Sequence, residues 1–94
     1  MSNPRKSAVK ALLKVENDAA YSNIALNAVL RESGLENADR AFASAIFYGV
    51  LDRRITIDFV LSKCIKTPIK KVAPFTLEVL RSAVYQIMFM DKIP

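Results

Sequence analysis

The sequence contains no histidine, a single cysteine and only two glycines. The absence of histidine removes the commonest general base and a usual zinc ligand, and a lone Cys64 cannot form an internal disulfide. We therefore expect no catalytic residues and no metal site in this chain, and a reducing, cytoplasmic location. No signal peptide is recognisable. The most apolar stretch, residues 79–90, is too short to span a membrane and contains Arg81 and Gln86.

The composition, 52% hydrophobic and 24% charged over 94 residues, fits one globular domain or part of one. The spacing of apolar residues is helical almost throughout, so we expect an all-α fold of about five helices. The expected helices cover residues 4–18, 22–33, 38–54, 56–65 and 74–90. Asn3 should cap the first helix, with Pro4 at its first position. Ser22 should cap the second helix, Thr56 should open the fourth, and Pro68 should stop it.

Each of the first four helices has one apolar side that should face the core. The inward residues are expected to be Ala8, Val9, Leu12, Leu13 and Val15, then Leu26, Val29 and Leu30, then Phe42, Ala45, Ile46, Gly49 and Val50, and finally Ile57, Val60, Leu61, Cys64 and Ile65. Gly34 should take the left-handed conformation that ends the second helix, with Leu35 packing back on its last turn.

The segment FYGVLDRR places the other glycine inside a helix, where it costs roughly 1 kcal/mol relative to alanine. Gly49 falls on the inward side with Ile46 and Val50. We expect that the missing side chain lets the backbone of another helix come close. Arg53 and Arg54 would then end the helix at the surface.

The last expected helix, 74–90, is apolar around most of its circumference. Leu77, Leu80, Val84, Ile87 and Met88 form one stripe, and Phe75, Val79, Ala83 and Met90 lie off it. Such a helix is normally buried centrally. Because four shorter amphipathic helices would cover only part of it, we expect further helices or a second copy of the chain to cover the rest. The second case would be a homodimer formed through this helix.

Cationic side chains gather in three places. They are Arg5, Lys6, Lys10 and Lys14 near the start of the chain, Arg53 and Arg54 at the end of the third helix, and Lys66, Lys70 and Lys71 in the later linker. The three lysines of the first group recur every fourth residue and so share one helix face. If the three groups converge, they form a phosphate-binding surface. Otherwise they are solvated faces, with the two arginines complementing a helix C-terminus.

Three further positions allow a functional and a structural interpretation. Arg40, beside Asp39, could contact a ligand, but an acid in a first helical turn and an exposed neighbour explain the pair equally well. Tyr48 could stack on a base, although a tyrosine on a helix flank is usually a packing residue. Cys64 lies in an apolar stripe and is expected to be a small buried hydrophobe rather than a nucleophile.

The segment DRAFASAIFYGVLDRR, from Asp39 to Arg54, resembles the most characteristic part of the NusB-like domain. In that family, an acidic-basic pair and an aromatic residue open a helix that ends in a tyrosine-glycine-valine-leucine run and an arginine. The resemblance covers nearly the whole chain. The other similar segments are Arg5, Ala8 and Leu12 in the first helix, and residues 20–30, 55–65 and 80–94.

Within this family, the residues from Tyr21 to Asn23 look more like the N-terminal domain of the small-subunit ribosomal RNA 5-methylcytosine methyltransferase than like the free-standing antitermination factor. The resemblance implies a domain of two small helical bundles whose basic first-helix side binds RNA. It also implies that family members continue beyond Pro94 with further helices. The S-adenosylmethionine site and the catalytic cysteines would lie in a domain absent from this chain, which itself would need no cofactor.

We therefore expect residues 1–94 to be a NusB-like RNA-binding domain that positions ribosomal RNA for a catalytic domain outside the chain. The expected RNA-binding residues are Arg5, Lys6, Lys10, Lys14, Arg40, Tyr48, Arg53 and Arg54. Two alternatives stay open. One is a free transcription antitermination factor that binds RNA together with a ribosomal protein, and the other is a helical adaptor that binds only protein.

Overall fold

The structure is a computed structural model that describes residues 3–18 and 21–90. Its helices are α1 (Pro4–Asp18), α2 (Ser22–Ser33), α3 (Asn37–Asp52), α4 (Arg54–Cys64) and α5 (Pro74–Phe89), with a 3₁₀ turn, η1 (Ile69–Lys71), between α4 and α5. The described residues contain no strand. The expected all-α fold with five helices is confirmed.

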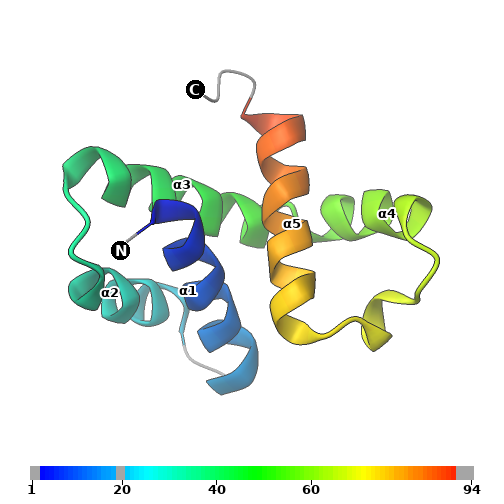
Figure 1. Ribbon diagram of the computed structural model, residues 1–94, viewed down its shortest axis with the longest axis horizontal. Helices are drawn as coiled ribbons and strands as arrows, with labels where there is room; N and C mark the ends of the chain where they lie inside the picture. Colours follow the sequence, from blue (N-terminus) through cyan, green and yellow to red (C-terminus); the bar gives the residue numbers. More distant parts are fainter. Residues whose placement is uncertain (1–2, 19–20, 91–94) are drawn as a thin grey trace.

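Helix α5 joins two parts of the molecule (Figure 1). On one side, α1 packs against both α2 and α3. On the other side, α4 packs against α5 and continues from the end of α3. Because α5 crosses α3 and contacts α1, α3 and α4, it occupies the central position that its apolar circumference predicts.

The core lies between α1, α3 and the neighbouring helices. The largest fully buried apolar side chains are Leu12, Ile46, Phe47, Val50 and Ile57. Leu77, Leu80 and Val84 of α5 pack against this core and are partly buried. Burial of each such side chain contributes about 1.5–3 kcal/mol, so the contact of α1 with α3 and α5 supplies much of the stability.

Several helix ends follow the sequence signals. Asn3 Oδ1 accepts hydrogen bonds from the backbone N–H groups of Arg5 and Lys6 at 2.9 and 3.2 Å, which confirms the N-cap of α1. Gly34 ends α2 with a φ of 74°, in the left-handed region that only glycine enters at no cost. Leu35 is buried after it, as expected.

Two helix starts differ from expectation. Ser22 is the first helical residue of α2, and Tyr21 precedes it without a side-chain cap. Helix α4 begins at Arg54 instead of Thr56, because Arg53 alone leaves the helical conformation. The Arg53 carbonyl already accepts a hydrogen bond from the Ile57 N–H at 2.9 Å, so a single residue separates α3 from α4.

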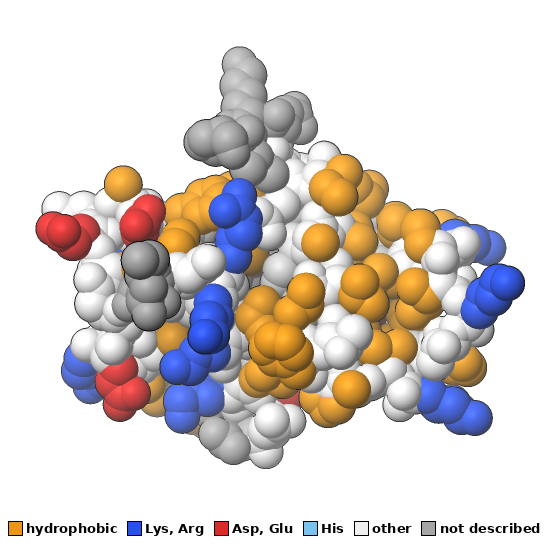
Figure 2. All heavy atoms as spheres, in the orientation of Figure 1, with side chains coloured by type: hydrophobic (Ala, Val, Ile, Leu, Met, Phe, Trp, Pro, Cys, Tyr) orange, Lys and Arg blue, Asp and Glu red, His pale blue; other side chains and the backbone are white. Residues whose placement is uncertain are grey.

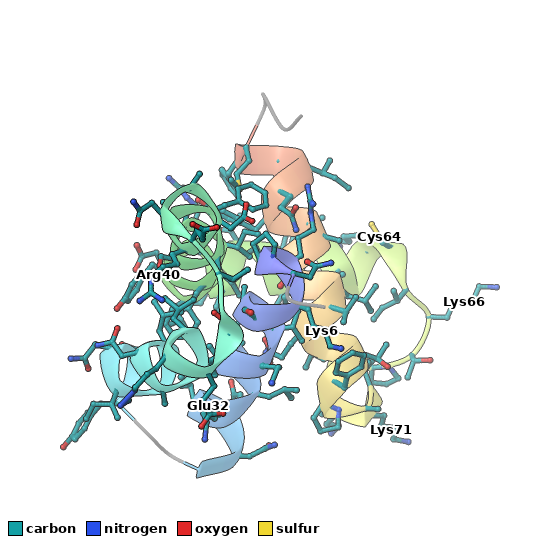
Figure 3. All side chains as sticks on the ribbon, turned by 60° about the vertical axis from the view of Figure 1, so that its left-hand side comes forward. Lys6, Glu32, Arg40, Cys64, Lys66 and Lys71 are labelled. Carbon is teal, nitrogen blue, oxygen red and sulfur yellow. The ribbon has the colours of Figure 1, made fainter. Side chains whose placement is uncertain are left out.

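The buried sides of α3 and α4 also differ in part. Ala45 is exposed, whereas Ala43 and Phe47 are buried, because α1 and α5 both pack against α3 and shift its buried side. Cys64 is exposed, so its expected burial is wrong. It is the last residue of α4 and lies at the outer end of that helix, beyond the part that α5 covers (Figure 3).

Helix α5 is rotated about its axis relative to expectation. Its fully buried residues are polar: Glu78, Arg81, Ser82 and Gln86. Two members of the expected apolar stripe face solvent, with Ile87 78% and Met88 42% exposed. Leu77, Leu80 and Val84 do pack on the core. The inward polar side is stabilised by partners on α1 and α4, which the apolar pattern of α5 alone does not reveal.

Gly49 lies against Tyr85 of α5. A methyl group at Gly49 would overlap the phenol ring of Tyr85. That ring also contacts the ring of Phe89, with centroids 5.6 Å apart. Close helix packing at this glycine is therefore confirmed, but the neighbour is a side chain and not the backbone that was expected.

We predict that Gly49→Ala destabilises the protein. Helix propensity alone would add about 1 kcal/mol of stability, whereas overpacking typically costs 1–3 kcal/mol because the Tyr85 ring has to leave its position. Urea unfolding of the variant measures the sign of the change. The same substitution in a Tyr85→Ala background should be stabilising, since the ring is then gone. A stabilised single variant would contradict the packing explanation.

Candidate nucleic-acid interface

A line of basic side chains follows α1 on one face of the molecule (Figure 2). This basic ridge consists of Arg5, Lys6, Lys10 and Lys14, all of which are exposed. Their spacing of four residues along the lysines places them above one another on the helix. Because Pro4 and the Asn3 cap fix the start of α1, the ridge is held on a regular helix and not on a loop.

Arg5 is held in place by two contacts. Its Nε–H donates to Gln86 Oε1 at 2.6 Å, and its guanidinium group lies over the Phe42 ring, 5.0 Å from the centroid. Gln86 is itself fixed, because its Nε2 donates to the Ser82 carbonyl at 3.1 Å. Arg5 therefore keeps an exposed, oriented guanidinium group, which is the arrangement that favours phosphate binding.

The two sides of the basic ridge have different character. Towards α2, a hollow of about 260 Å³ is lined by Lys6, Lys10 and the acidic Glu32. Towards α5, a second hollow of about 280 Å³ has no acid among its lining residues. Figure 2 shows apolar side chains directly beside the basic line on this second side. A polyanion on the ridge is therefore favoured on the α5 side.

The second hollow, here called the α1–α5 hollow, has an apolar wall and a basic rim. The wall includes Val9, Phe75, Val79 and Ala83, and the rim carries Arg5 and Lys6. Phe75 is 57% exposed, although it lies on the helix at the centre of the fold. The hollow therefore combines an exposed aromatic ring with cationic groups.

Three other expected RNA-binding residues make contacts within the protein. Arg40 Nη1 donates to the Leu30 carbonyl at 3.2 Å and ties α3 to the end of α2. Tyr48 packs its ring edge-on against Phe47, 5.0 Å between centroids, and stays 40% exposed. The Arg53 guanidinium lies over the Phe89 ring at 4.3 Å. Tyr48 thus makes a packing contact, and Arg40 is held by a contact with α2.

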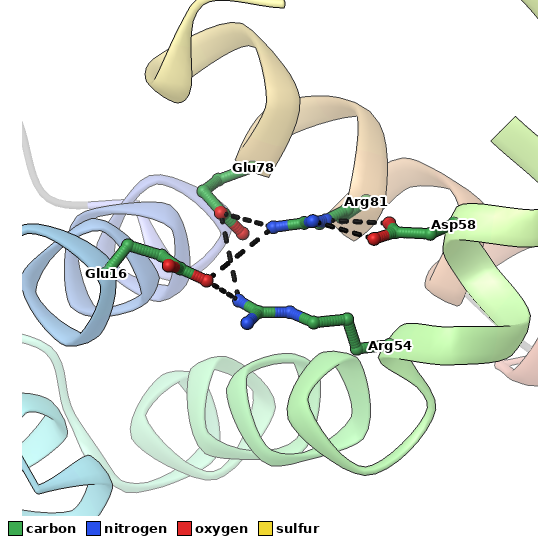
Figure 4. Close-up of polar contacts among 5 residues, drawn as sticks. All are labelled: Glu16, Arg54, Asp58, Glu78 and Arg81. Atoms are coloured by element: carbon green, nitrogen blue, oxygen red, sulfur yellow. Dashed lines mark hydrogen bonds and ion pairs between the residues drawn. The ribbon is translucent and has the colours of Figure 1, made fainter. Parts of the chain in front are cut away.

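Arg54 belongs to an ion cluster of Glu16, Arg54, Asp58, Glu78 and Arg81 (Figure 4). Arg54 pairs with Glu16 and lies 4.0 Å from Glu78. Arg81 donates two hydrogen bonds to Asp58, at 2.7 and 2.8 Å, and one to Glu78 at 2.8 Å. The ion cluster connects α1, α4 and α5, so Arg54 does not extend the basic ridge.

Burial and the neighbouring charges together shift the pKa values of two groups in the ion cluster. Burial raises the pKa of Glu78 above its ordinary value of 4.5, although the positive charges of Arg81 and Arg54 act in the opposite direction. For Arg81, burial acts to lower the pKa, but the carboxylates of Asp58 and Glu78 outweigh it and raise the pKa. The helical patterns of the sequence did not predict this cluster. The sequence feature that could have indicated the ion cluster is the pair Glu78 and Arg81, which lie one turn apart in a largely apolar helix.

The lysines of the later linker form a separate group. Lys66 and Lys71 project from the connection between α4 and α5, apart from Lys6 (Figure 3). Lys70 lines a cleft of about 770 Å³ that the ion cluster borders. The three cationic groups of the sequence therefore do not converge on one surface. Among the described residues, no acidic or cysteine cluster could hold a metal, and no helix is long and apolar enough to cross a membrane.

Comparison with known proteins identifies the family. The NusB family matches residues 2–94 of this chain. The chain belongs to the NusB family. The resemblance seen in the segment from Asp39 to Arg54 is confirmed, and a helical bundle is the fold that the family fits.

Two kinds of curated relative are found. The chain is 36% identical over 90 residues to a probable ribosomal RNA small subunit methyltransferase B of Bacillus subtilis. This match covers 96% of the chain and 20% of that protein. It is 27% identical to the corresponding protein of Synechocystis over 94 residues, 100% of the chain and 21% of that protein. It is 28% identical to a transcription antitermination protein NusB of Ruminiclostridium cellulolyticum over 91 residues, 96% of the chain and 63% of that protein.

The chain thus spans about a fifth of the methyltransferases that it matches, at their N-terminal part, and under two thirds of the antitermination protein. No solved structure matches it significantly. The part of the methyltransferases that the chain matches is their N-terminal, non-catalytic part.

We predict that Glu78 makes the protein less stable as the pH rises. A carboxyl group whose pKa is raised by folding keeps its proton in the folded state where the unfolded state has lost it, so stability falls as pH rises from about 4.5 through the raised pKa. Urea unfolding at several pH values should show this fall for the wild type relative to Glu78→Gln, which does not titrate. Glu32→Gln, an exposed acid outside the ion cluster, is the matched control. If the free energy of unfolding of the wild type instead rises with pH relative to that of Glu78→Gln, the charges of the two arginines outweigh burial.

Proposed function

We propose that this chain is an RNA-binding domain whose basic ridge contacts the phosphates of ribosomal RNA. The observation that carries the proposal is the exposed ridge on α1, in which Arg5 is oriented by Gln86 and Phe42. A fixed guanidinium group loses little conformational freedom on binding phosphate, and lysines at regular spacing add charge along the same face. Arg40, Tyr48, Arg53 and Arg54 stay secondary candidates for contact with RNA.

We further propose that the domain positions RNA for a cytosine-5 methyltransferase domain that uses S-adenosylmethionine and lies outside this chain. The support is the similarity to the N-terminal part of small-subunit methyltransferase B proteins, which reaches 36% identity. In this proposal, residues 1–94 bind and orient the substrate and take no part in the chemical step. The domain would act in the cytoplasm.

A free antitermination factor is the second candidate, because the chain is also similar to transcription antitermination protein NusB. Such a factor would bind RNA together with a ribosomal protein, and exposed apolar side chains such as Phe59 and Ile87 are available for a protein contact. The gene sequence after the codon for Pro94 separates the two candidates, since a methyltransferase domain is either encoded there or not. An adaptor that binds only protein is the third candidate, and RNA titration tests it.

We predict that Lys6→Glu together with Lys10→Glu weakens RNA binding and reduces its dependence on salt. Each phosphate contact releases counterions, with a log–log slope of about −0.7 per contact for single strands, so three or four contacts give roughly −2 to −3. The measurement is a titration of single-stranded ribosomal RNA fragments at several salt concentrations. Both affinity and slope should fall in the double variant.

The matched control for this experiment is Lys66→Glu with Lys71→Glu. It changes the net charge by the same amount at a site away from the basic ridge. If the two double variants lose affinity and slope equally, binding depends on net charge alone, and the ridge is not the contact surface. An unchanged slope in the Lys6 and Lys10 variant would remove α1 from the contact surface, and absence of RNA binding by the wild type would favour the adaptor.

We also predict that the 94-residue chain self-associates through the exposed side of α5. Ile87 and Met88 are exposed to solvent in the monomer, and burying such a side chain contributes about 1.5–3 kcal/mol to the free energy of association. Light scattering should show a mass that rises with concentration, and Ile87→Lys should reduce the rise. Ile24→Lys, on an exposed residue of α2, is the control. A monomer at high concentration that binds no hydrophobic dye would contradict this prediction.

A further inference from the structure

We propose that the α1–α5 hollow binds one unpaired nucleobase of the RNA strand whose phosphates lie on the basic ridge, with the base stacked on Phe75. This inference rests on the proposed RNA-binding function and adds to it a site for the base. It implies that the domain contacts a base of single-stranded RNA as well as the RNA phosphates. A base that is paired in a duplex would not enter the hollow.

The shape and lining of the hollow suit a flat aromatic ligand. Its volume of about 280 Å³ lies just below the range of roughly 300–1,000 Å³ for drug-sized ligands, so it has room for a single base. Val9, Val79 and Ala83 give it an apolar wall. Phe75 is 57% exposed beside them, and an aromatic ring in this position is the platform on which unpaired bases stack in RNA-binding proteins.

The rim supplies the charge that a nucleotide needs. Arg5 and Lys6 line the hollow on the α1 side, and the lining contains no acid. Arg5 is oriented by its hydrogen bond to Gln86, which itself lines the hollow. A phosphate on Arg5 or Lys6 therefore lies next to the space that its base would occupy. This juxtaposition of cations and an apolar wall distinguishes a nucleotide from an uncharged ligand.

The hollow also has one buried polar group that lacks a partner. Ser82 is 3% exposed and is among the lining residues, and its Oγ has no hydrogen-bond partner among the described residues. A buried hydroxyl without a partner is unfavourable, so a ligand in the hollow with a donor or acceptor that reaches Ser82 would be favoured. A nucleobase offers both on its edge, whereas an aliphatic side chain of a partner protein offers neither.

The first experiment uses the absence of tryptophan from the chain. The Phe75→Trp variant carries a single indole, which a stacked base should quench. We expect titration with a short single-stranded oligoadenylate to quench its fluorescence, and titration with the same oligomer made entirely of abasic residues to leave it unchanged. The Phe59→Trp variant is the control, because Phe59 is also exposed (63%) and has Lys63 beside its ring at 5.2 Å, but it does not line the hollow.

The second experiment measures affinity. Phe75→Ala should weaken oligoadenylate binding by about 5- to 150-fold, the loss of one stacked base, and leave binding of the abasic oligomer unchanged. Phe75→Tyr should restore the wild-type affinity, while Phe59→Ala should have no effect. Circular dichroism melts of all variants check that each one folds.

The outcomes separate this inference from the proposed function. If the wild type binds both oligomers equally and Phe75→Ala changes nothing, the base site is wrong and phosphate binding by the basic ridge stands. In that case a side chain of a protein partner becomes the alternative ligand of the hollow. If neither oligomer binds, the proposed function fails and the base site fails with it.

Discussion

The packing of α5 depends on burying a charged side chain, Arg81, inside a helical protein. Its side chain is only 8% exposed, and Asp58 and Glu78 hold it with three hydrogen bonds. Removing one partner from such a group typically costs 3–5 kcal/mol, because a charge is left buried without compensation. The partners lie on α4 and α5, and Glu16 of α1 is 3.9 Å away. The ion cluster therefore fixes the rotation of α5 relative to the rest of the fold.

That rotation decides what the surface offers. With Glu78 and Arg81 turned inward, the adjacent side of α5, which carries Ser82 and Gln86, leaves Phe75 and Val79 exposed beside the α1–α5 hollow. The same rotation brings Gln86 to Arg5 and so links the buried polar side of α5 to the basic ridge. Interior and surface are thus connected through one helix. Helix α5 carries both the buried charges of Glu78 and Arg81 and the exposed ring of Phe75 beside the cations of α1.

The helical arrangement around α5 agrees with membership of the NusB family. The family is represented both by N-terminal parts of ribosomal RNA methyltransferases and by antitermination proteins. Both proposed roles need a surface that holds RNA without performing chemistry on it. A regular helix that presents spaced cations, beside a hollow with an exposed ring, would meet that need through the proposed phosphate contact and base stacking.

The sequence by itself determined the elements of this protein. Helix periodicity, the Asn3 cap and the Gly34 stop depend on neighbours in the chain, so the five helices and the basic side of α1 were predictable. The tertiary structure decided which sides of the helices meet. The exposure of Cys64, the place of Arg54 in the ion cluster and the contact of Tyr85 with Gly49 depend on residues distant in the sequence. An apolar helix such as α5 has no pattern that fixes its rotation, because only the charged partners on α1 and α4 select it.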